Sequence, residues 1–168
     1  MIRVRRAEVA DAAAVREVGL RTWPVAYDGL ASPEFIEEGL AAWWSPEMVE
    51  RGISNGITLI AVDEAEQGGG DRIYDERVVG MVGVGREDEL WVMWKLYILP
   101  EYQGQGVGKA LLEAAISALP ADATQLLLDV LITNEPAIRF YRKHGFVEAR
   151  DLPQRDLGGE LMWMSLDL

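Results

Sequence analysis

The most informative run of the sequence is Leu96-Tyr97-Ile98-Leu99-Pro100-Glu101-Tyr102-Gln103-Gly104-Gln105-Gly106-Val107-Gly108-Lys109. An apolar, strand-like segment leads into a loop with glycines at three alternate positions, and a predicted amphipathic helix over 106–119 follows at once. Glycine lets the backbone approach a ligand closely. The start of a helix offers unpaired N–H groups and a partial positive charge. The run therefore predicts an anion site, most naturally for a phosphate or pyrophosphate.

Two common phosphate motifs fit this run poorly. A Walker A loop has Gly where this chain has Gln103, and Ser or Thr where it has Ala110. A dinucleotide fingerprint has a different glycine spacing and lies near the start of a βαβ unit. A glycine-rich turn without a ligand is the structural alternative, but three glycines that open a helix cost stability unless something uses them. A nucleotide-binding fold stays open as an alternative.

A second pattern lies at 134–146, where Asn134 can cap a helix that Gly145 ends. Asn134 and Tyr141 are separated by about two helical turns, so both lie on one side of that helix. Gln103-x-x-Gly106-x-Gly108 resembles the Q/R-x-x-G-x-G/A signature of the GNAT family of N-acetyltransferases. The 134–146 segment resembles that family's N-x-x-A-x-x-x-Y-x-K-x-G-F pattern. The start of the chain is also similar, and the resemblance is weakest over 25–55 and around Gly70.

The remaining elements follow from periodicity. Asp11 can cap a helix that runs toward Trp23 and that Pro24 ends or kinks. Pro33 and Pro46 each mark the start of a short helix. Strands are expected at 2–5, 57–62, 78–85, 89–99, 125–130, 146–149 and 160–166, with a long loop around 68–70 inside a hairpin. This order predicts an α/β (α+β) fold in a single domain over 1–168. The resemblance implies a central twisted mixed sheet of about seven strands, flanked by helices and splayed at a cofactor cleft.

The resemblance also implies acetyl-CoA as cosubstrate, without a metal. Backbone groups of Leu96, Tyr97 and Ile98 correspond to those that pair with the pantetheine arm. The loop amides that bind the pyrophosphate, and a helix asparagine that contacts the cofactor, correspond to Gly104, Gln105, Gly106, Val107, Gly108, Lys109 and Asn134. The family's general acid corresponds to Tyr141. A thiol has a pKa near 8.5 and a phenol about 10, so a tyrosine can protonate the departing sulfur.

An amine also needs a base, and the family often uses a carboxylate. Asp129 lies on the strand before Asn134, where some members carry a glutamate; Glu89 is a rival. Trp23 and Tyr27 follow the first helix, in the region that forms the family's acceptor pocket. Trp43, Trp44, Trp91 and Trp94 add aromatic surface, although aromatic residues usually pack in a core. The segment 34–50 is either a lid or a pair of surface helices. His144, the single histidine, suits a helix end better than catalysis.

Composition excludes several classes of function. The chain has no cysteine, which excludes disulfides, thiolate metal sites and a covalent cysteine intermediate. A net charge of −12 disfavours nucleic acid and anionic membranes as partners, and mildly favours a cationic small substrate. The expected location is the cytoplasm. We therefore predict direct acetyl transfer to a primary amine of a small molecule or peptide, in a chain that the resemblance suggests forms a homodimer. A non-catalytic acyl-CoA-binding regulatory module is the alternative.

Overall fold

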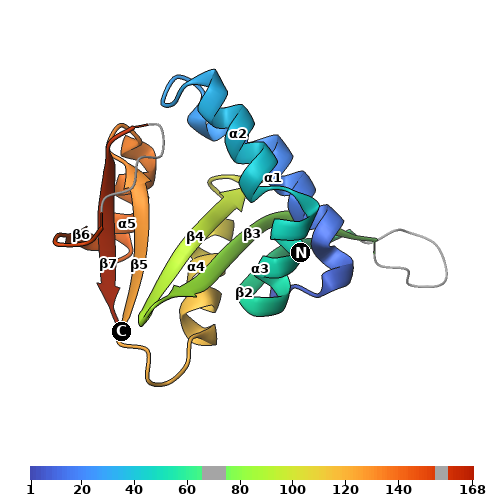
Figure 1. Cartoon of the computed structure of the whole chain (residues 1–168). Coiled ribbons are helices and arrows are strands. Elements are labelled where there is room, and N and C mark those ends of the chain that lie inside the picture. Colours follow the sequence, from blue (N-terminus) through green and yellow to red (C-terminus); the bar gives the residue numbers. More distant parts are fainter. Residues whose placement is uncertain (66–74, 154–158) are drawn as a thin grey trace.

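A computed structural model describes residues 1–65, 75–153 and 159–168 of the chain. Its seven-stranded mixed sheet has the order β1-β2-β3-β4-β5-β7-β6 (Figure 1). The strands are β1 (Ile2–Arg6), β2 (Ile57–Ala65), β3 (Asp75–Glu87), β4 (Leu90–Ile98), β5 (Gln125–Leu131), β6 (Val147–Ala149) and β7 (Leu161–Asp167). The predicted fold class is confirmed. The predicted Gly68–Gly70 loop lies outside the described residues.

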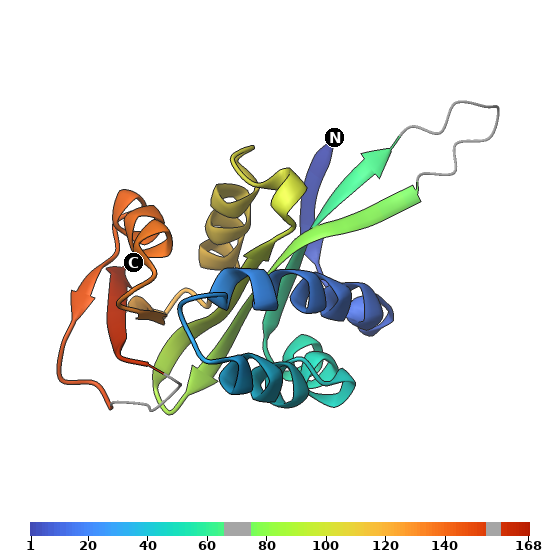
Figure 2. The ribbon, with the colours of Figure 1, turned by 90° about the horizontal axis from the view of Figure 1, so that it is seen from above.

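Five α-helices cover the two faces of the sheet within the described residues. They are α1 (Ala12–Tyr27), α2 (Pro33–Trp43), α3 (Pro46–Asn55), α4 (Val107–Ala118) and α5 (Glu135–Lys143), with short 3₁₀ turns at Val9–Asp11 and Pro100–Tyr102. Figure 2 shows α1, α2 and α3 on one face, and α4 and α5 on the other. None of the described helices has the length and apolar character that crossing a membrane requires.

The starts of α2 and α3 agree with the sequence. Each helix begins with proline at its first position and a serine just before it. Ser32 Oγ accepts a hydrogen bond from the Phe35 amide, and Ser45 Oγ accepts one from the Met48 amide. These caps satisfy backbone donors that the first turn of a helix leaves open.

The structure corrects two points about the first helix. Of the two alternatives for Pro24, an end to the helix is wrong: α1 continues to Tyr27, because packing of its aromatic residues outweighs the one hydrogen bond that proline removes. Asp11 does not cap α1 with its side chain. Its carboxylate instead accepts hydrogen bonds from the Arg5 guanidinium at 2.8 and 3.0 Å, and from the Glu8 amide at 2.8 Å.

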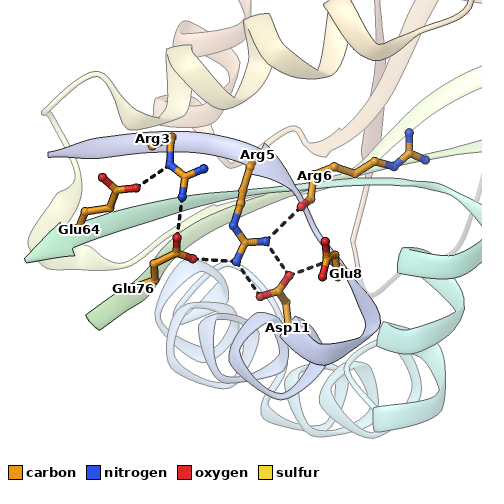
Figure 3. A network of polar contacts seen from close by, with 7 residues as sticks. All are labelled: Arg3, Arg5, Arg6, Glu8, Asp11, Glu64 and Glu76. Carbon is orange, nitrogen blue, oxygen red and sulfur yellow. Dashed lines mark hydrogen bonds and ion pairs between the residues drawn. The ribbon is translucent and has the colours of Figure 1, made fainter. Parts of the chain in front are cut away.

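Asp11 belongs to a polar network at the edge of the sheet (Figure 3). Arg5 also reaches Glu76 on β3, and Arg3 bonds to both Glu64 on β2 and Glu76. The bond from Arg5 is the main reason that the pKa of Asp11 is lowered. The network ties the edge strand β1 to its neighbours and to the start of α1.

The sheet opens between its two central parallel strands. β4 and β5 pair at only two positions, Trp91 with Leu126 and Val92 with Leu127. Beyond these positions β4 keeps its antiparallel neighbour β3, and β5 keeps β7. The predicted splay is confirmed. It leaves the β5-facing backbone edge of 93–98 without a strand partner in the described chain.

Candidate active site

A cavity of about 840 Å³ lies where β4 and β5 part. It extends from Arg86, near the end of β3, past Trp94 in the middle of β4, to Pro100 and Gln103, just before the glycine loop. Eight of the predicted site residues line it: Trp23, Tyr27, Leu96, Tyr97, Ile98, Asp129, Asn134 and Tyr141. The fold therefore brings the predicted pantetheine strand, the predicted acid and base, and the predicted acceptor residues to one space.

The loop beyond the cavity depends on its first two glycines. Gly104 and Gly106 have φ angles of +75° and +82°, and a Cβ added at either would meet no atom within 4 Å. Glycine is needed there for its left-handed conformation, and the space above it is open. Two side-chain amides hold the loop: Gln103 Nε2 donates to the Ile98 carbonyl at 3.1 Å, and Gln105 Nε2 donates to the Glu101 carbonyl at 2.8 Å.

The exposed N-terminus of α4 is open to a ligand. Gly106 is its N-cap and has no side chain with which to cap the first turn. The first-turn amides therefore face outward with the positive end of the helix dipole. This arrangement suits a diphosphate, because two anionic groups can be met by several amides with no side chain between them.

Residues 107–109 differ from one another in what they contact. A Cβ at Gly108 would lie 3.3 Å from Ile98 Cδ1 and 3.4 Å from the Phe140 ring, so this glycine serves the packing of α4. Val107 is buried. The Lys109 side chain is exposed, and its Nζ lies 3.6 Å from Glu113 of the same helix. A role in phosphate binding therefore rests on the backbone amides of these residues rather than on the lysine charge.

Three tyrosines and one carboxylate converge in the cavity. The Tyr27 and Tyr97 hydroxyls lie 3.2 Å apart. Burial is the main reason that the pKa of each of Tyr27, Tyr97 and Tyr141 is raised, and the Asp129 charge raises all three further. The three phenols therefore keep their protons at neutral pH. The Tyr141 ring packs against Phe140 and Phe146, which fixes its direction on α5.

Other candidates have mainly structural surroundings. The Asn134 side chain accepts a hydrogen bond from the Ala137 amide at 3.4 Å and so caps α5, although it also lines the cavity. His144 Nδ1 lies 2.8 Å from the Phe140 carbonyl at the end of that helix, as the sequence suggested. Glu89 is 90% exposed, pairs with Arg86 at 2.7 Å and does not line the cavity.

The tryptophans divide between cavity and core. Trp23 is 6% exposed, donates from Nε1 to the Ile36 carbonyl at 3.1 Å, and has its ring 4.4 Å from the Tyr27 ring. It is therefore both a core residue and part of the cavity wall. Trp43 and Trp94 also line the cavity. Trp44 is 0% exposed, so the expectation that it adds aromatic surface is wrong.

Sequence reasoning missed a role for Lys95, the one charged residue in an otherwise apolar strand. The register between β3 and β4 shifts so that Gly83 pairs with Lys95 and Val84 with Met93, which leaves Trp94 as a bulge. Simple alternation of side chains between the two faces is therefore interrupted at this point. Trp94 and Lys95, although consecutive, both contact groups on the α1–α3 side: the Trp163 ring for Trp94, and the Trp43 carbonyl for Lys95.

Known proteins share this architecture. A family model described as an acetyltransferase (GNAT) domain matches residues 54–148. An uncharacterized N-acetyltransferase of Mycobacterium bovis is 31% identical over 141 residues, which cover 82% of this chain and 84% of that protein. An N-alpha-acetyltransferase of Sulfurisphaera tokodaii is 37% identical over 65 residues, which cover 38% of this chain and only 39% of that relative.

Among solved structures, the PaiA N-acetyltransferase of Thermoplasma acidophilum in complex with coenzyme A has a TM-score of 0.80. The alignment covers 100% of this chain and 99% of that one at 23% identity, a likeness that speaks for the fold alone. The domain match over more than half of the chain, together with the mycobacterial relative, shows that this chain belongs to the GNAT family of N-acetyltransferases.

Proposed function

We propose that this protein transfers the acetyl group of acetyl-CoA directly to a primary amine of a small molecule or peptide. The observation that carries the proposal is the gap between β4 and β5, which opens at one end onto the glycine loop and is lined by Tyr141 and Asp129. A long cofactor arm fits such a gap, because the backbone of β4 offers it a row of unused donors and acceptors.

The cofactor is held mainly by backbone groups in this proposal. Leu96, Tyr97 and Ile98 pair with the pantetheine amides in the way a missing strand would. The amides from Gly104 to Lys109 bind the diphosphate at the start of α4, and Asn134 contacts the arm from the other side. Binding at a helix N-terminus is local, so the overall negative charge of the protein does not oppose it strongly at physiological salt.

The chemistry needs one proton removed and one supplied. The amine nitrogen attacks the thioester carbonyl carbon, and Asp129 takes the proton that the nitrogen loses. As the carbon–sulfur bond breaks, Tyr141 donates its proton to the sulfur, so that coenzyme A leaves as a thiol. The raised pKa of Tyr141 keeps the phenol in the protonated form that this step uses.

Steady-state thiol release from acetyl-CoA with a panel of amines tests the proposal. We expect turnover with at least one amine. Tyr141→Phe should lower kcat roughly 10²- to 10⁴-fold, while calorimetry should show that the variant still binds coenzyme A. Tyr102→Phe is the matched control, because the Tyr102 hydroxyl donates to Asp63 and does not line the cavity.

Three results would contradict the proposal in different ways. Coenzyme A binding without turnover of any amine identifies a non-catalytic acyl-CoA-binding module. A larger thermal shift with ATP or NAD than with coenzyme A favours a nucleotide-binding protein. Equal activity of Tyr141→Phe and Tyr102→Phe removes Tyr141 as the acid. The predicted homodimer and cytoplasmic location stay predictions.

A further inference from the structure

The cavity is positively charged although the protein is acidic. Its charged lining residues within the described chain are three cations, Arg51, Arg86 and Lys95, and one anion, Asp129. The whole chain carries a net charge of −12. Arg86 is paired with Glu89 at 2.7 Å, so the cations without a recorded ion pair among the described residues are Arg51 on α3 and Lys95 on β4.

Lys95 is the most enclosed of these cations. Its Nζ donates to the Trp43 carbonyl at 2.6 Å and lies 4.0 Å from the centre of the Trp44 ring. Both contacts favour the charged ammonium form, whereas burial lowers its pKa to about 8. An ammonium has three N–H donors; the carbonyl accepts one and the Trp44 ring covers another side, which leaves one donor direction for a ligand in the cavity.

The residue beside Lys95 on the neighbouring strand is a glycine. Thr58 on β2 pairs with Gly83 on β3, and Gly83 pairs with Lys95 on β4, so the three residues form one row across the sheet. Gly83 has no side chain, and a Cβ there would lie 3.6 Å from Lys95 Cβ. Thr58 Oγ1 lies 3.8 Å from the position of a Cβ added at Gly52 of α3, and Arg51 and Asn55 of the same helix also line the cavity.

This row, which we call the Thr58–Gly83–Lys95 row, carries an ammonium and a hydroxyl on either side of a glycine. Arg51 and Asn55 on α3 add a guanidinium and an amide to the cavity lining. Such a set suits a carboxylate, because its two oxygens can accept several bonds at once, and because burying it beside an ammonium offsets the loss of water. The same set disfavours a second ammonium at this end of the cavity. The mild preference for a cationic small substrate stays a prediction.

We propose that the Thr58–Gly83–Lys95 row binds a carboxylate of the amine acceptor, so that the acceptor is an amino acid or peptide with a free acidic group. This inference rests on the acetyl transfer proposed above. Lys95 lies two residues before Tyr97 on β4, which is about 7 Å along a strand. The acceptor therefore spans from the carboxylate at this row to its amine beside Tyr97, Tyr27 and Asp129.

Paired acceptors give the sharpest kinetic test. The test compares amino acids in which increasing numbers of methylenes separate the amine from the carboxylate. Each is paired with its primary amide, which has the same length but an uncharged group in place of the carboxylate. We expect kcat/KM to favour the carboxylate of the best length by roughly 10- to 100-fold. Lys95→Met should bring this ratio close to one while the amide is still turned over. Lys143→Met, an exposed lysine that does not line the cavity, should leave the ratio unchanged.

Binding provides a second readout that does not depend on turnover. Calorimetry in the presence of coenzyme A compares an N-acetylated amino acid with its amide, on the wild type and on Lys95→Met. Tighter binding of the carboxylate to the wild type alone supports the inference, even if no amine is turned over. Equal binding of acid and amide, or an acid preference that survives in Lys95→Met, overturns it. If no amine is turned over but the N-acetylated amino acid still binds more tightly than its amide, the result counts against acetyl transfer and not against the carboxylate site.

Discussion

The hydroxyl oxygens of Tyr27 and Tyr97 lie 3.2 Å apart and join the end of α1 to β4 across the cavity. Both phenols keep raised pKa values, so one hydroxyl donates to the other and the second proton is free to reach a ligand. The pair thus fixes one wall of the cavity. It also places a donor next to the predicted acid Tyr141.

Replacing one member of the pair should weaken acceptor binding. Tyr27→Phe removes a hydrogen bond between uncharged groups. We therefore expect the KM of the acceptor to rise roughly 2- to 10-fold, with a much smaller change in kcat. Steady-state kinetics at saturating acetyl-CoA measures this. A fall in kcat as large as that of Tyr141→Phe would instead make Tyr27 part of the proton transfer.

Two glycines with the same backbone strain allow the cofactor loop to be tested. Gly106 has φ +82° and Gly29, in the turn after α1, has φ +74°; neither has an atom within 4 Å of an added Cβ. Alanine at either position should cost about 1–2 kcal/mol of unfolding free energy. Only Gly106→Ala should raise KM for acetyl-CoA, because only this loop presents amides to the diphosphate. Equal KM values for the two variants would argue against the loop as the anion site.

The packing of α1 against Trp44 should depend on Gly19. A Cβ at Gly19 on α1 would lie 2.0 Å from the Trp44 ring, which is fully buried. Gly19→Ala should therefore lower the free energy of unfolding, measured in urea melts, by about 1–3 kcal/mol or more. Gly52→Ala is the control in a helix, since its Cβ would meet only Thr58 Oγ1 at 3.8 Å. It should be neutral, or stabilise by roughly 0.5–1 kcal/mol.

Much of this fold follows from local signals. The helix that follows the glycine loop and the proline-led starts of α2 and α3 agree with positions read along the chain, whereas Tyr141 and Asp129 were expected together only from the family resemblance. The bulge at Trp94 could not be read from the sequence, because it depends on which residues of β3 lie opposite β4. For the same reason the sequence alone gives Lys95 no role. Only its register beside Gly83 shows that it lies in the cavity.

Stability should depend on pH through Lys95. Burial lowers its pKa from 10.5 to about 8, so the folded state binds this proton less tightly than the unfolded state does. The cost of keeping the ammonium buried is therefore fully present below pH 8 and disappears as the pH rises toward 10.5. Between pH 7 and about pH 10.5, the unfolding free energy of the wild type should therefore rise relative to that of Lys95→Met by on the order of 2–3 kcal/mol. Thermal melts from pH 6 to about pH 10.5 measure it. A constant difference over this range would contradict the lowered pKa.

The short pairing of β4 with β5, at Trp91–Leu126 and Val92–Leu127, has a further consequence for the protein between turnovers. An interior strand whose edge has lost its neighbour presents the same unpaired groups as the outermost strand of a sheet, and such edges recruit foreign strands. A cofactor lying along β4 would shield that edge. Acetyl-CoA would then protect the protein from aggregation as well as react. The protein without bound cofactor would be the form most prone to aggregate.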